Sequence, residues 1–327
     1  MTIQTNARAH TPIRHFLDLR DLDSATLRDI IDVGRAVKAM QKNRRAPMHP
    51  AHPLAGRTLG LMLSKPSTRT RLSFEVGMRQ LGGDVSVLSP SDMQIGRGES
   101  LADTARVLSR FLDVLVVRTG ETDMLGELVR WSSIPVVNGL TPDSHPVQIL
   151  ADIMTYEEHR GPVAGSHWAW IGDGNNVAAS LIEGAVRFGF SLTLATPESM
   201  KPRQDVLDWA RAEGGKIRLV HDPIEAVREA GCIVTDTWTS MSDEESAVRL
   251  NTLRPFQVNT ALMQKAPEGA LFMHCLPAHI GEEVTEDVFE SPASVVFDEA
   301  ENRLHAQKGL LLWVLGGENW RDFGSPA

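Results

Sequence analysis

Hydroxyl and guanidinium side chains follow one another in residues 67–71, which read Ser-Thr-Arg-Thr-Arg. An apolar stretch, residues 59–63, precedes them, and a helical pattern follows over residues 68–81. The segment therefore begins a helix, where unpaired N–H groups and the helix dipole favour an anion. An N-cap with solvated arginines is the alternative, but five consecutive phosphate-matching residues favour a phosphate cradle. Its candidate ligands are Ser67, Thr68, Arg69 and Thr70.

Two further polar residues stand at element ends in the first half of the chain. Arg118 follows the apolar strand 114–117, at the carboxyl edge where open α/β sheets gather ligands, although such an arginine is often simply exposed. His145 precedes Pro146, and proline suits the first position of a helix. The imidazole therefore either points into a cleft or serves as a surface cap.

The second half contributes a glycine-rich turn, an acid and a cysteine. The turn, residues 172–176, partly matches a dinucleotide-binding turn, but Val177 occupies the place of the third glycine. Asp236 ends an apolar strand and suits either an ammonium group or an Asx-turn. Cys275 follows another strand, where a free cysteine is typically a small buried apolar residue.

Short apolar strands alternate with amphipathic helices along most of the chain. Strands are expected at 59–63, 84–88, 114–117, 134–138, 168–171, 191–195, 216–220, 232–236, 270–273 and 295–297. Helices are expected at 22–42, 68–81, 100–110, 146–159 and 177–188. The first of these helices has Asp23 or Ser24 as its cap. This alternation predicts the α/β class, with two open parallel-sheet domains, an intervening cleft and joining helices.

The composition bounds the partners and the location. The chain has 327 residues, 42% of them hydrophobic, which allows a sizeable core and two domains. A net charge of −9 argues against nucleic acid or an anionic membrane as partner, because both need a basic face. Two cysteines in unrelated contexts, no apolar run near the ~20 residues of a membrane span, and no apolar segment in residues 1–15 predict a cytoplasmic location.

Four segments, in order along the chain, resemble signature motifs of the aspartate and ornithine carbamoyltransferases. Residues 67–71 resemble the carbamoyl-phosphate-binding motif of this family. Residues 145–148 (His-Pro-Val-Gln), 236–241 (Asp-Thr-Trp-Thr-Ser-Met) and 274–277 (His-Cys-Leu-Pro) resemble motifs of its ornithine branch. The similarity runs from about residue 15 to about residue 317, and four motifs in the family's order make it specific.

The resemblance implies how the chain is divided. A carbamoyl-phosphate-binding domain over residues 12–153 is expected to precede an ornithine-binding domain over residues 154–327. The final helix, at about residues 304–320, is expected to return to the first domain, so that the domains are not strictly sequential.

By the same resemblance, one group of side chains binds carbamoyl phosphate. Thr70, Arg118 and His145 would surround the carbonyl oxygen, stabilise the charge that grows on it, and act in catalysis together with Cys275. Arg303, for which a surface ion pair is the alternative, would be a further ligand. The full set is Ser67, Thr68, Arg69, Thr70, Gln94, Arg118, His145, Gln148, Cys275, Leu276 and Arg303.

A second group would bind ornithine. It consists of Asn176, Asp236, Ser240 and Met241. Cys275 would lie beside the amine of the acceptor, in a place expected to give its thiol access and local positive charge. Aspartate carbamoyltransferases have proline at this position, which argues against aspartate as the acceptor. Ser242 stands where the family usually has glycine, and Ile280 where many bacterial relatives carry arginine.

The implied reaction needs no metal and no organic cofactor. The δ-amine of ornithine would attack carbamoyl phosphate to give citrulline and phosphate, in arginine biosynthesis or, reversed, in arginine catabolism. The family also implies a homotrimer, or a multiple of trimers, in which the loop 91–100 extends Gln94 into a neighbouring subunit. An ordinary mobile surface loop is the alternative for this segment.

Other functions remain to be weighed. Putrescine or N-acetylornithine could replace ornithine, although Asn176, Asp236 and residues 240–241 favour a free α-amino acid. A dinucleotide-dependent oxidoreductase needs a completed glycine turn, which residues 172–177 do not provide. A catalytically dead interaction paralogue should have lost part of the anion-binding set, and all of that set is present.

Overall fold

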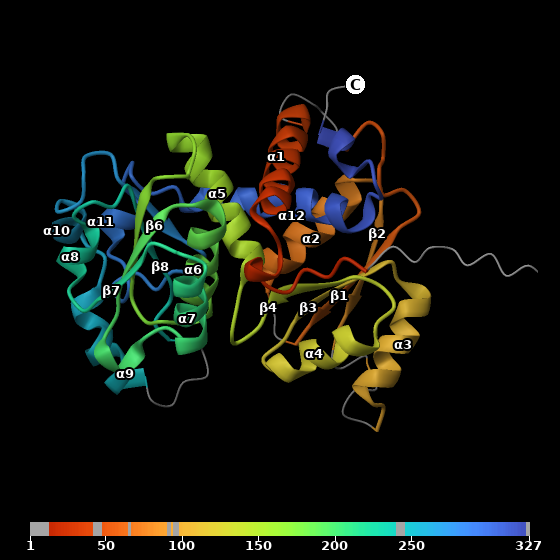
Figure 1. The fold of residues 1–327 in the computed structure, drawn as a ribbon, viewed down its shortest axis with the longest axis horizontal. Helices are drawn as coiled ribbons and strands as arrows, with labels where there is room; N and C mark the ends of the chain where they lie inside the picture. Colours follow the sequence, from red (N-terminus) through yellow and green to blue (C-terminus); the bar gives the residue numbers. More distant parts are fainter. Residues whose placement is uncertain are drawn as a thin grey trace, which may run out of the picture.

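Two parallel sheets form the framework of the molecule (Figure 1). The computed structural model describes residues 13–41, 48–64, 67–89, 93, 98–239 and 246–324. The first sheet has the strand order β2-β1-β3-β4 and the second the order β7-β6-β5-β8-β9. The strands are β1 (Thr58–Leu63), β2 (Asp84–Leu88), β3 (Val114–Arg118), β4 (Val136–Leu140), β5 (His167–Ile171), β6 (Ser191–Ala195), β7 (Ile217–Val220), β8 (Cys232–Thr235) and β9 (Leu271–His274).

Helices cover both sheets and connect them. The longer helices are α1 (Ser24–Gln41), α2 (Thr68–Gln80), α3 (Leu101–Phe111), α4 (Thr122–Trp131), α5 (Pro146–Arg160), α6 (Asn176–Phe188), α7 (Gln204–Ala212), α9 (Ser246–Leu253) and α12 (Val296–Leu315). The shorter ones are η1 (Leu19–Asp21), η3 (Glu198–Met200), α8 (Pro223–Val227), η4 (Arg254–Phe256), α10 (Thr260–Met263), α11 (Glu286–Phe289) and η5 (Trp320–Gly324). No helix in the described part of the chain is both long and apolar enough to cross a bilayer.

The predicted α/β class and the two open parallel sheets are confirmed. Apart from residues 295–297 and the final helix, the bounds of the expected strands and helices differ from the observed ones by at most two residues. β4 begins at Val136, two residues later than expected, because Pro135 has no N–H to donate to a neighbouring strand. Asp23, the residue before α1, accepts from the N–H of Thr26 at 2.7 Å, as a cap does.

The expected strand at residues 295–297 is wrong. Ser294 forms an isolated bridge to Phe272, and Val296 already belongs to α12. A short apolar run fits a buried strand and the first turn of a buried helix equally well, and here the helical period that continues to Leu315 decides.

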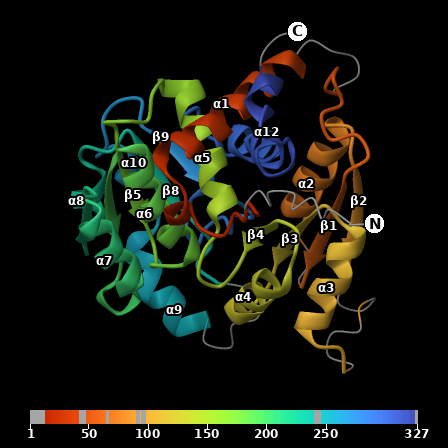
Figure 2. The ribbon, with the colours of Figure 1, turned by 45° about the vertical axis from the view of Figure 1, so that its right-hand side comes forward.

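Helix α12 connects the two halves. It packs against α1, α2 and α5 and against β9 of the second sheet. Figure 1 shows α1, α5 and α12 between the two lobes, and Figure 2 shows α12 nearly end-on beside α2. Helix α12 is therefore held by helices of the first lobe and by a strand of the second sheet at once.

Glycines allow α1 and α12 to approach closely. A Cβ added at Gly309 of α12 would lie 2.1 Å from the backbone oxygen of Ile30, and one added at Gly34 of α1 would lie 2.7 Å from the backbone oxygen of His305. Backbone atoms cannot rotate away as a side chain does, so any larger residue must separate the helices. This contact fixes how α12 sits on the first lobe.

We expect Gly309→Ala to destabilise the fold by about 2 kcal/mol or more, since overpacking outweighs the ~1 kcal/mol that alanine gains in a helix. Gly126 of α4 is the matched control, because a Cβ there meets nothing within 4 Å. Gly126→Ala should leave stability unchanged or raise it. Urea denaturation of both variants measures the difference, and equal stability of the two would contradict the close contact.

Candidate active site

Side chains from both lobes surround a cavity of about 140 Å³. The first lobe contributes the start of α2, the carboxyl ends of β3 and β4, and the start of α5. The second contributes the start of α6, the ends of β8 and β9, and α12. The lining residues are Ser67, Arg69, Thr70, Arg118, Leu140, His145, Asn176, Val177, Asp236, Thr237, Cys275, Leu276, Pro277 and Arg303.

The start of α2 faces this cavity. Ser67 is the N-cap in extended conformation, and its side chain makes no capping hydrogen bond. Thr70, one turn on, is fully buried, and its hydroxyl accepts from Nη1 of Arg118 at 3.2 Å. Arg69 reaches across the cleft and donates to the backbone oxygen of Leu276. The helix terminus therefore presents N–H groups, hydroxyls and a guanidinium to one small space, as an anion requires.

Three guanidinium groups meet at the cavity. Burial lowers the pKa of Arg69 and of Arg118, and in the second case the charge of Arg69 lowers it further. Burial also lowers the pKa of Arg303 to about 10, with Arg118 and Arg69 adding to the effect and Cys275 and Asp152 opposing it. Three cations that disfavour one another in a buried space form a site prepared for a multiply charged anion.

His145 is a neutral donor in this field. Its side chain is buried, and its backbone N–H donates to Ser180 Oγ at 2.8 Å, which fixes the start of α5. Burial holds the pKa of His145 well below its ordinary value, and the charges of Arg303, Arg118 and Arg69 lower it further. Nδ1 is buried without a hydrogen-bond partner in the described structure. A neutral imidazole can polarise a carbonyl oxygen by donating one N–H, as an oxyanion-type donor does.

On the second lobe, Asp236 connects three neighbours. Its Oδ1 accepts from Cys275 Sγ at 3.0 Å and from the N–H of Thr237 at 2.7 Å, and its Oδ2 accepts from Asn175 Nδ2 at 2.9 Å. Asn176, the first residue of α6, donates from its side chain to the backbone oxygen of Thr141 at 2.8 Å. The acid is thus held rigidly at the wall opposite the start of α2.

The expectation that Cys275 has a reactive, positively surrounded thiol is wrong. Burial raises the pKa of its thiol well above the ordinary value, and the adjacent Asp236 and then Glu299 raise it further. The arginines therefore do not dominate the field at the sulfur. At neutral pH Cys275 is a protonated thiol that donates to Asp236.

The remaining predicted residues fall into three groups. Thr68 is exposed and does not line the cavity, and Arg71 is exposed and pairs with Glu75 at 3.3 Å. Gln148 is buried behind the wall, where its Oε1 accepts from Arg303 at 2.5 Å. Outside the described residues lie Gln94, Ser240, Met241 and Ser242.

Sequence reasoning missed several residues of the site. Leu140, Val177 and Pro277 line the cavity, and apolar residues at element ends carry no signal of this role. Asn175 could have been predicted, since it stands in the glycine-rich turn 172–176. Its Oδ1 caps α6 by accepting from the N–H groups of Val177 and Ala178, both at 3.0 Å, while its amide holds Asp236.

Possible metal ligands near the site are already engaged. Asp236, His274 and Cys275 have ligand atoms within 4.8 Å of one another. However, His274 Nδ1 accepts from the N–H of Leu276 at 2.9 Å, and its Nε2 lies 3.1 Å from Glu283 Oε1. Both ring nitrogens thus hold the loop after β9, and a metal would have to displace one of these bonds.

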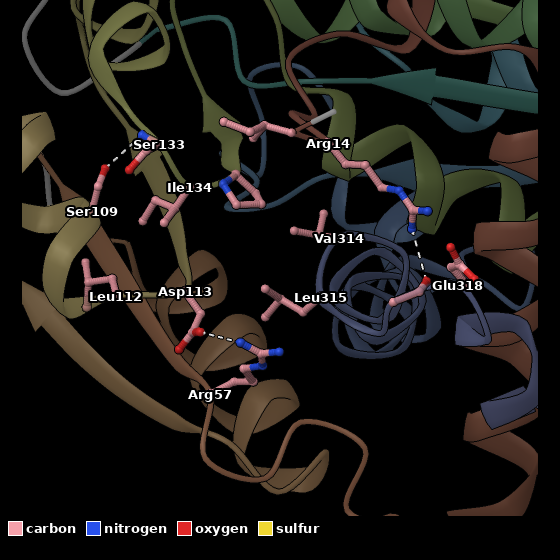
Figure 3. Close-up of a pocket in the computed structure, with 13 residues that line it drawn as sticks. Arg14, Arg57, Ser109, Leu112, Asp113, Ser133, Ile134, Val314, Leu315 and Glu318 are labelled. Carbon is pink, nitrogen blue, oxygen red and sulfur yellow. Dashed lines mark hydrogen bonds and ion pairs between the residues drawn. The ribbon is translucent and has the colours of Figure 1, made fainter. Parts of the chain in front are cut away.

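A second, more open cavity lies near the amino-terminal ends of β3 and β4 (Figure 3). Its charged residues make contacts within the fold. Arg57 pairs with Asp113 at 2.7 Å, and Arg14 donates to the backbone oxygens of Trp313 at 2.8 Å and Gly317 at 3.3 Å. The contacts of Arg14 fix the end of α12. Unlike the cavity between the lobes, this second cavity has no cluster of three arginines among the described residues that line it.

The fold and the site define a class of enzyme that binds an anionic substrate at a helix terminus in one domain and a polar acceptor on the facing domain. The comparisons identify that class. The chain belongs to the aspartate/ornithine carbamoyltransferase family: the carbamoyl-P binding domain model matches residues 14–158 and the Asp/Orn binding domain model residues 164–314. It is therefore a carbamoyltransferase, as the resemblance predicted.

Individual relatives with high identity to this chain belong to the same family. The chain is 56% identical over 303 residues to the ornithine carbamoyltransferase of Nitrobacter winogradskyi, covering 93% of this chain and 97% of the relative. That of Agrobacterium fabrum is 54% identical over 303 residues, with 93% and 98% covered. The solved ornithine carbamoyltransferase from Pyrococcus furiosus superposes with a TM-score of 0.88 at 45% identity, with 93% and 97% covered.

We expect Asp236→Asn to lower the pH at which iodoacetamide alkylates Cys275 by roughly one unit or more, because removing the adjacent charge favours the thiolate. The pH midpoint of the alkylation rate, followed by mass spectrometry of the Cys275 peptide, measures this shift. The plateau rate at high pH separates access from ionisation. Asp222→Asn, which removes the acid that caps α8, serves as the control. An unchanged midpoint would show that Asp236 does not hold the thiol protonated.

Proposed function

We infer that this chain transfers the carbamoyl group of carbamoyl phosphate to the δ-amine of L-ornithine, giving L-citrulline and phosphate. The observation that carries the proposal is the meeting of Arg69, Arg118 and Arg303 opposite the hydrogen-bonded pair of Asp236 and Cys275. One wall suits a phosphate and a polarised carbonyl, and the other suits an amine. Relatives that are 54–56% identical over most of the chain are ornithine carbamoyltransferases.

Each side chain of the first wall has a physical task. Ser67, Arg69 and Thr70 hold the phosphate together with the N–H groups at the start of α2, to which Thr68 contributes its backbone while its side chain stays exposed, and Arg303 neutralises the charge. Arg118, His145 and Thr70 hydrogen-bond the carbonyl oxygen, on which negative charge grows as the amine attacks. The N–H of Leu276 is engaged with His274, which orients the backbone beside the carbamoyl group.

The acceptor wall selects an α-amino acid with a side-chain amine. Asn176 lies at the start of α6, where the helix dipole favours the α-carboxylate. Asp236 and the neutral thiol of Cys275 accept from and orient the δ-amine. Ser240 and Met241 complete the ornithine site. Putrescine and N-acetylornithine lack, respectively, the free α-carboxylate and the free α-amine that these residues address.

The reaction proceeds by positioning and electrostatics. The unprotonated amine attacks the carbonyl carbon, a tetrahedral intermediate forms, and the C–O bond to phosphate breaks. The leaving phosphate takes the proton of the amine, so no side chain need act as a dedicated base. Arginine biosynthesis or, in reverse, arginine catabolism is the pathway, in the cytoplasm, where the free cysteines Cys232 and Cys275 stay reduced.

The domain division follows the same proposal. Residues 12–153 form the domain that binds carbamoyl phosphate and residues 154–327 the domain that binds ornithine. The last part of α12 belongs with the first domain, which its packing against α1 and α2 supports.

Citrulline formation from carbamoyl phosphate and a panel of amines (ornithine, putrescine, N-acetylornithine and aspartate) tests the proposal. We expect ornithine to give the highest kcat/KM. Arg69→Ala should lower kcat/KM roughly 10²–10³-fold, because it removes a donor to the anion. Arg71→Ala is the matched control from the same motif, since its side chain faces solvent. Equal losses in the two variants, or preference for another amine, would contradict the assignment.

The working unit is a homotrimer, or a multiple of trimers, in which Gln94 enters the site of a neighbouring subunit. Exposed apolar side chains on α3 of the first lobe support an interface there: Val107 and Phe111 lie one turn apart on this helix, with Phe111 74% exposed. Such residues rarely stay open to water in a large patch.

Mixing the inactive variants Gln94→Ala and Arg118→Ala should restore part of the activity. In a hybrid trimer a subunit with Arg118 intact can lie beside one with Gln94 intact, and that pair makes one complete site. Activity is measured after subunit exchange, with each variant alone as control. A monomer by light scattering, or no recovered activity, would refute the shared site.

A further inference from the structure

A buried group of carboxyl and amide side chains lies directly behind Arg303. Gln148 of α5 donates from one atom, Nε2, to two carboxyl groups: Asp152 Oδ1 at 2.8 Å and Glu299 Oε1 at 2.8 Å. All three side chains are about 1% exposed. Glu299 Oε2 in turn accepts from the backbone N–H of His274 at 2.8 Å. The group therefore connects α5, α12 and the end of β9.

The orientation of the Gln148 amide is fixed by its partners. A guanidinium has no acceptor, so the group that Arg303 Nη1 meets at 2.5 Å must be the carbonyl oxygen of Gln148. The amide nitrogen then faces Asp152 and Glu299. The oxygen of Gln148 is thereby held toward Arg303, which lines the cavity.

Two carboxyl groups in this arrangement require a proton. Asp152 and Glu299 each accept from the same nitrogen of Gln148 at 2.8 Å, so their carboxyl groups lie close together, and a hydrogen bond between two carboxyl groups needs an O–H. While both are ionised, Oδ2 of Asp152 is buried without a donor among the described residues. Burial raises the pKa of Asp152 to about 7 and that of Glu299 well above its ordinary value, and each charge raises the pKa of the other.

We propose that Asp152 and Glu299 are positioning residues that share a single proton. The one-proton pair holds the Gln148 amide and Arg303 on one side and the backbone before Cys275 on the other, in the arrangement that binds carbamoyl phosphate. This inference rests on the proposed function and assigns to the site a protonation state on which its affinity for the anion depends.

The charges around the pair explain why one negative charge, and not two, is tolerated. Arg303 favours ionisation of both carboxyls, whereas Asp236 disfavours that of Asp152. In the described part of the chain no cation is hydrogen-bonded to either carboxyl, because Arg303 donates to Gln148 instead, so a second charge on the pair would be uncompensated. The groups that face the pair are Arg303 on α12, Asp236 and Cys232 from β8 and its end, Arg69 on α2, and Cys275 after β9.

The shared proton makes the affinity for carbamoyl phosphate depend on pH. The folded protein keeps the shared proton below the raised pKa and loses it as the pH rises above it. The pair then carries two negative charges beside Arg303, which repel the phosphate and break the bond between the carboxyls. Since the pKa of Glu299 is raised well above its ordinary value, the last proton of the pair leaves in the alkaline range. The KM for carbamoyl phosphate should rise there, while kcat at saturating carbamoyl phosphate changes less.

Asp152→Asn and Asp152→Ala separate this state from mere structural support. In D152N the amide oxygen still accepts from Gln148, and its N–H replaces the shared proton in the bond to an ionised Glu299. The net charge stays at −1 with no proton left to lose. D152N should therefore keep KM within about fivefold of the wild type at pH 7 and show no alkaline rise. D152A removes one of the two acceptors of the Gln148 amide and should raise KM roughly tenfold.

The experiment measures KM for carbamoyl phosphate and kcat between pH 6 and 9 for the wild type, D152N and D152A, with folding checked by thermal unfolding. Substrate ionisation is common to all three proteins and cancels in the ratio of wild-type to D152N KM. A ratio that rises with pH supports the shared proton, and a constant ratio overturns it. Calorimetric titration with inorganic phosphate over the same range gives a second readout that does not require turnover.

The two proposals fail in different ways. In one outcome the wild type makes no citrulline, its affinity for phosphate falls as the pH rises, and the affinity of D152N does not. The proposed function is then wrong, and the shared proton is supported. If citrulline is formed and the wild type and D152N have the same pH profile, the function stands and the pair is only structural.

Discussion

The repulsion among Arg69, Arg118 and Arg303 is the constraint on which the site depends. Isolated in water these cations would separate, but the fold brings them to one small cavity from α2, the end of β3 and α12. Burial lowers the pKa of each of them, and repulsion from the neighbouring arginines lowers the pKa of Arg118 and of Arg303 further. The cost is offset when an anion with several charges occupies the space. The same field keeps His145 neutral, so that it can donate to a carbonyl oxygen without adding a further cation.

Three acidic side chains lie near the three arginines and partly offset their positive charge. Glu299 and Asp152 face Arg303, and Asp236 faces the cavity from the other lobe. Asp236 acts against the arginines at the sulfur of Cys275, which is why that thiol stays protonated although guanidiniums lie nearby. The low-dielectric surroundings strengthen the attraction across the cleft, so Asp236 raises the pKa of Arg69 and of Arg118 and offsets part of the effect of burial.

Helix α12 makes these positions interdependent. It carries Glu299 and Arg303 in its first half. In its second half, Gly309 packs against α1. Glu299 also accepts from the backbone of His274, so the same helix fixes the loop that carries Cys275 and Leu276. A change in how α12 sits on α1 would therefore move ligands on both walls. The positions of the ligands in the cleft thus depend on the packing between the lobes.

The sequence by itself determined the α/β class and most strands and helices, because their periodicity and their ends are local features. Together with the motifs that resemble those of carbamoyltransferases, it also indicated the polar residues that line the cavity, except Thr237. It misplaced residues 295–297, since a short apolar run has no period by which to separate strand from helix. It counted Arg71 with Arg69 among five phosphate-matching residues without naming Arg71 as a ligand, and the structure separates the two, because a turn of ~100° per residue places them on different faces of α2. Only the tertiary structure decided the protonation of Cys275 and the pairing of Asp152 with Glu299, because burial and charges from distant segments set both.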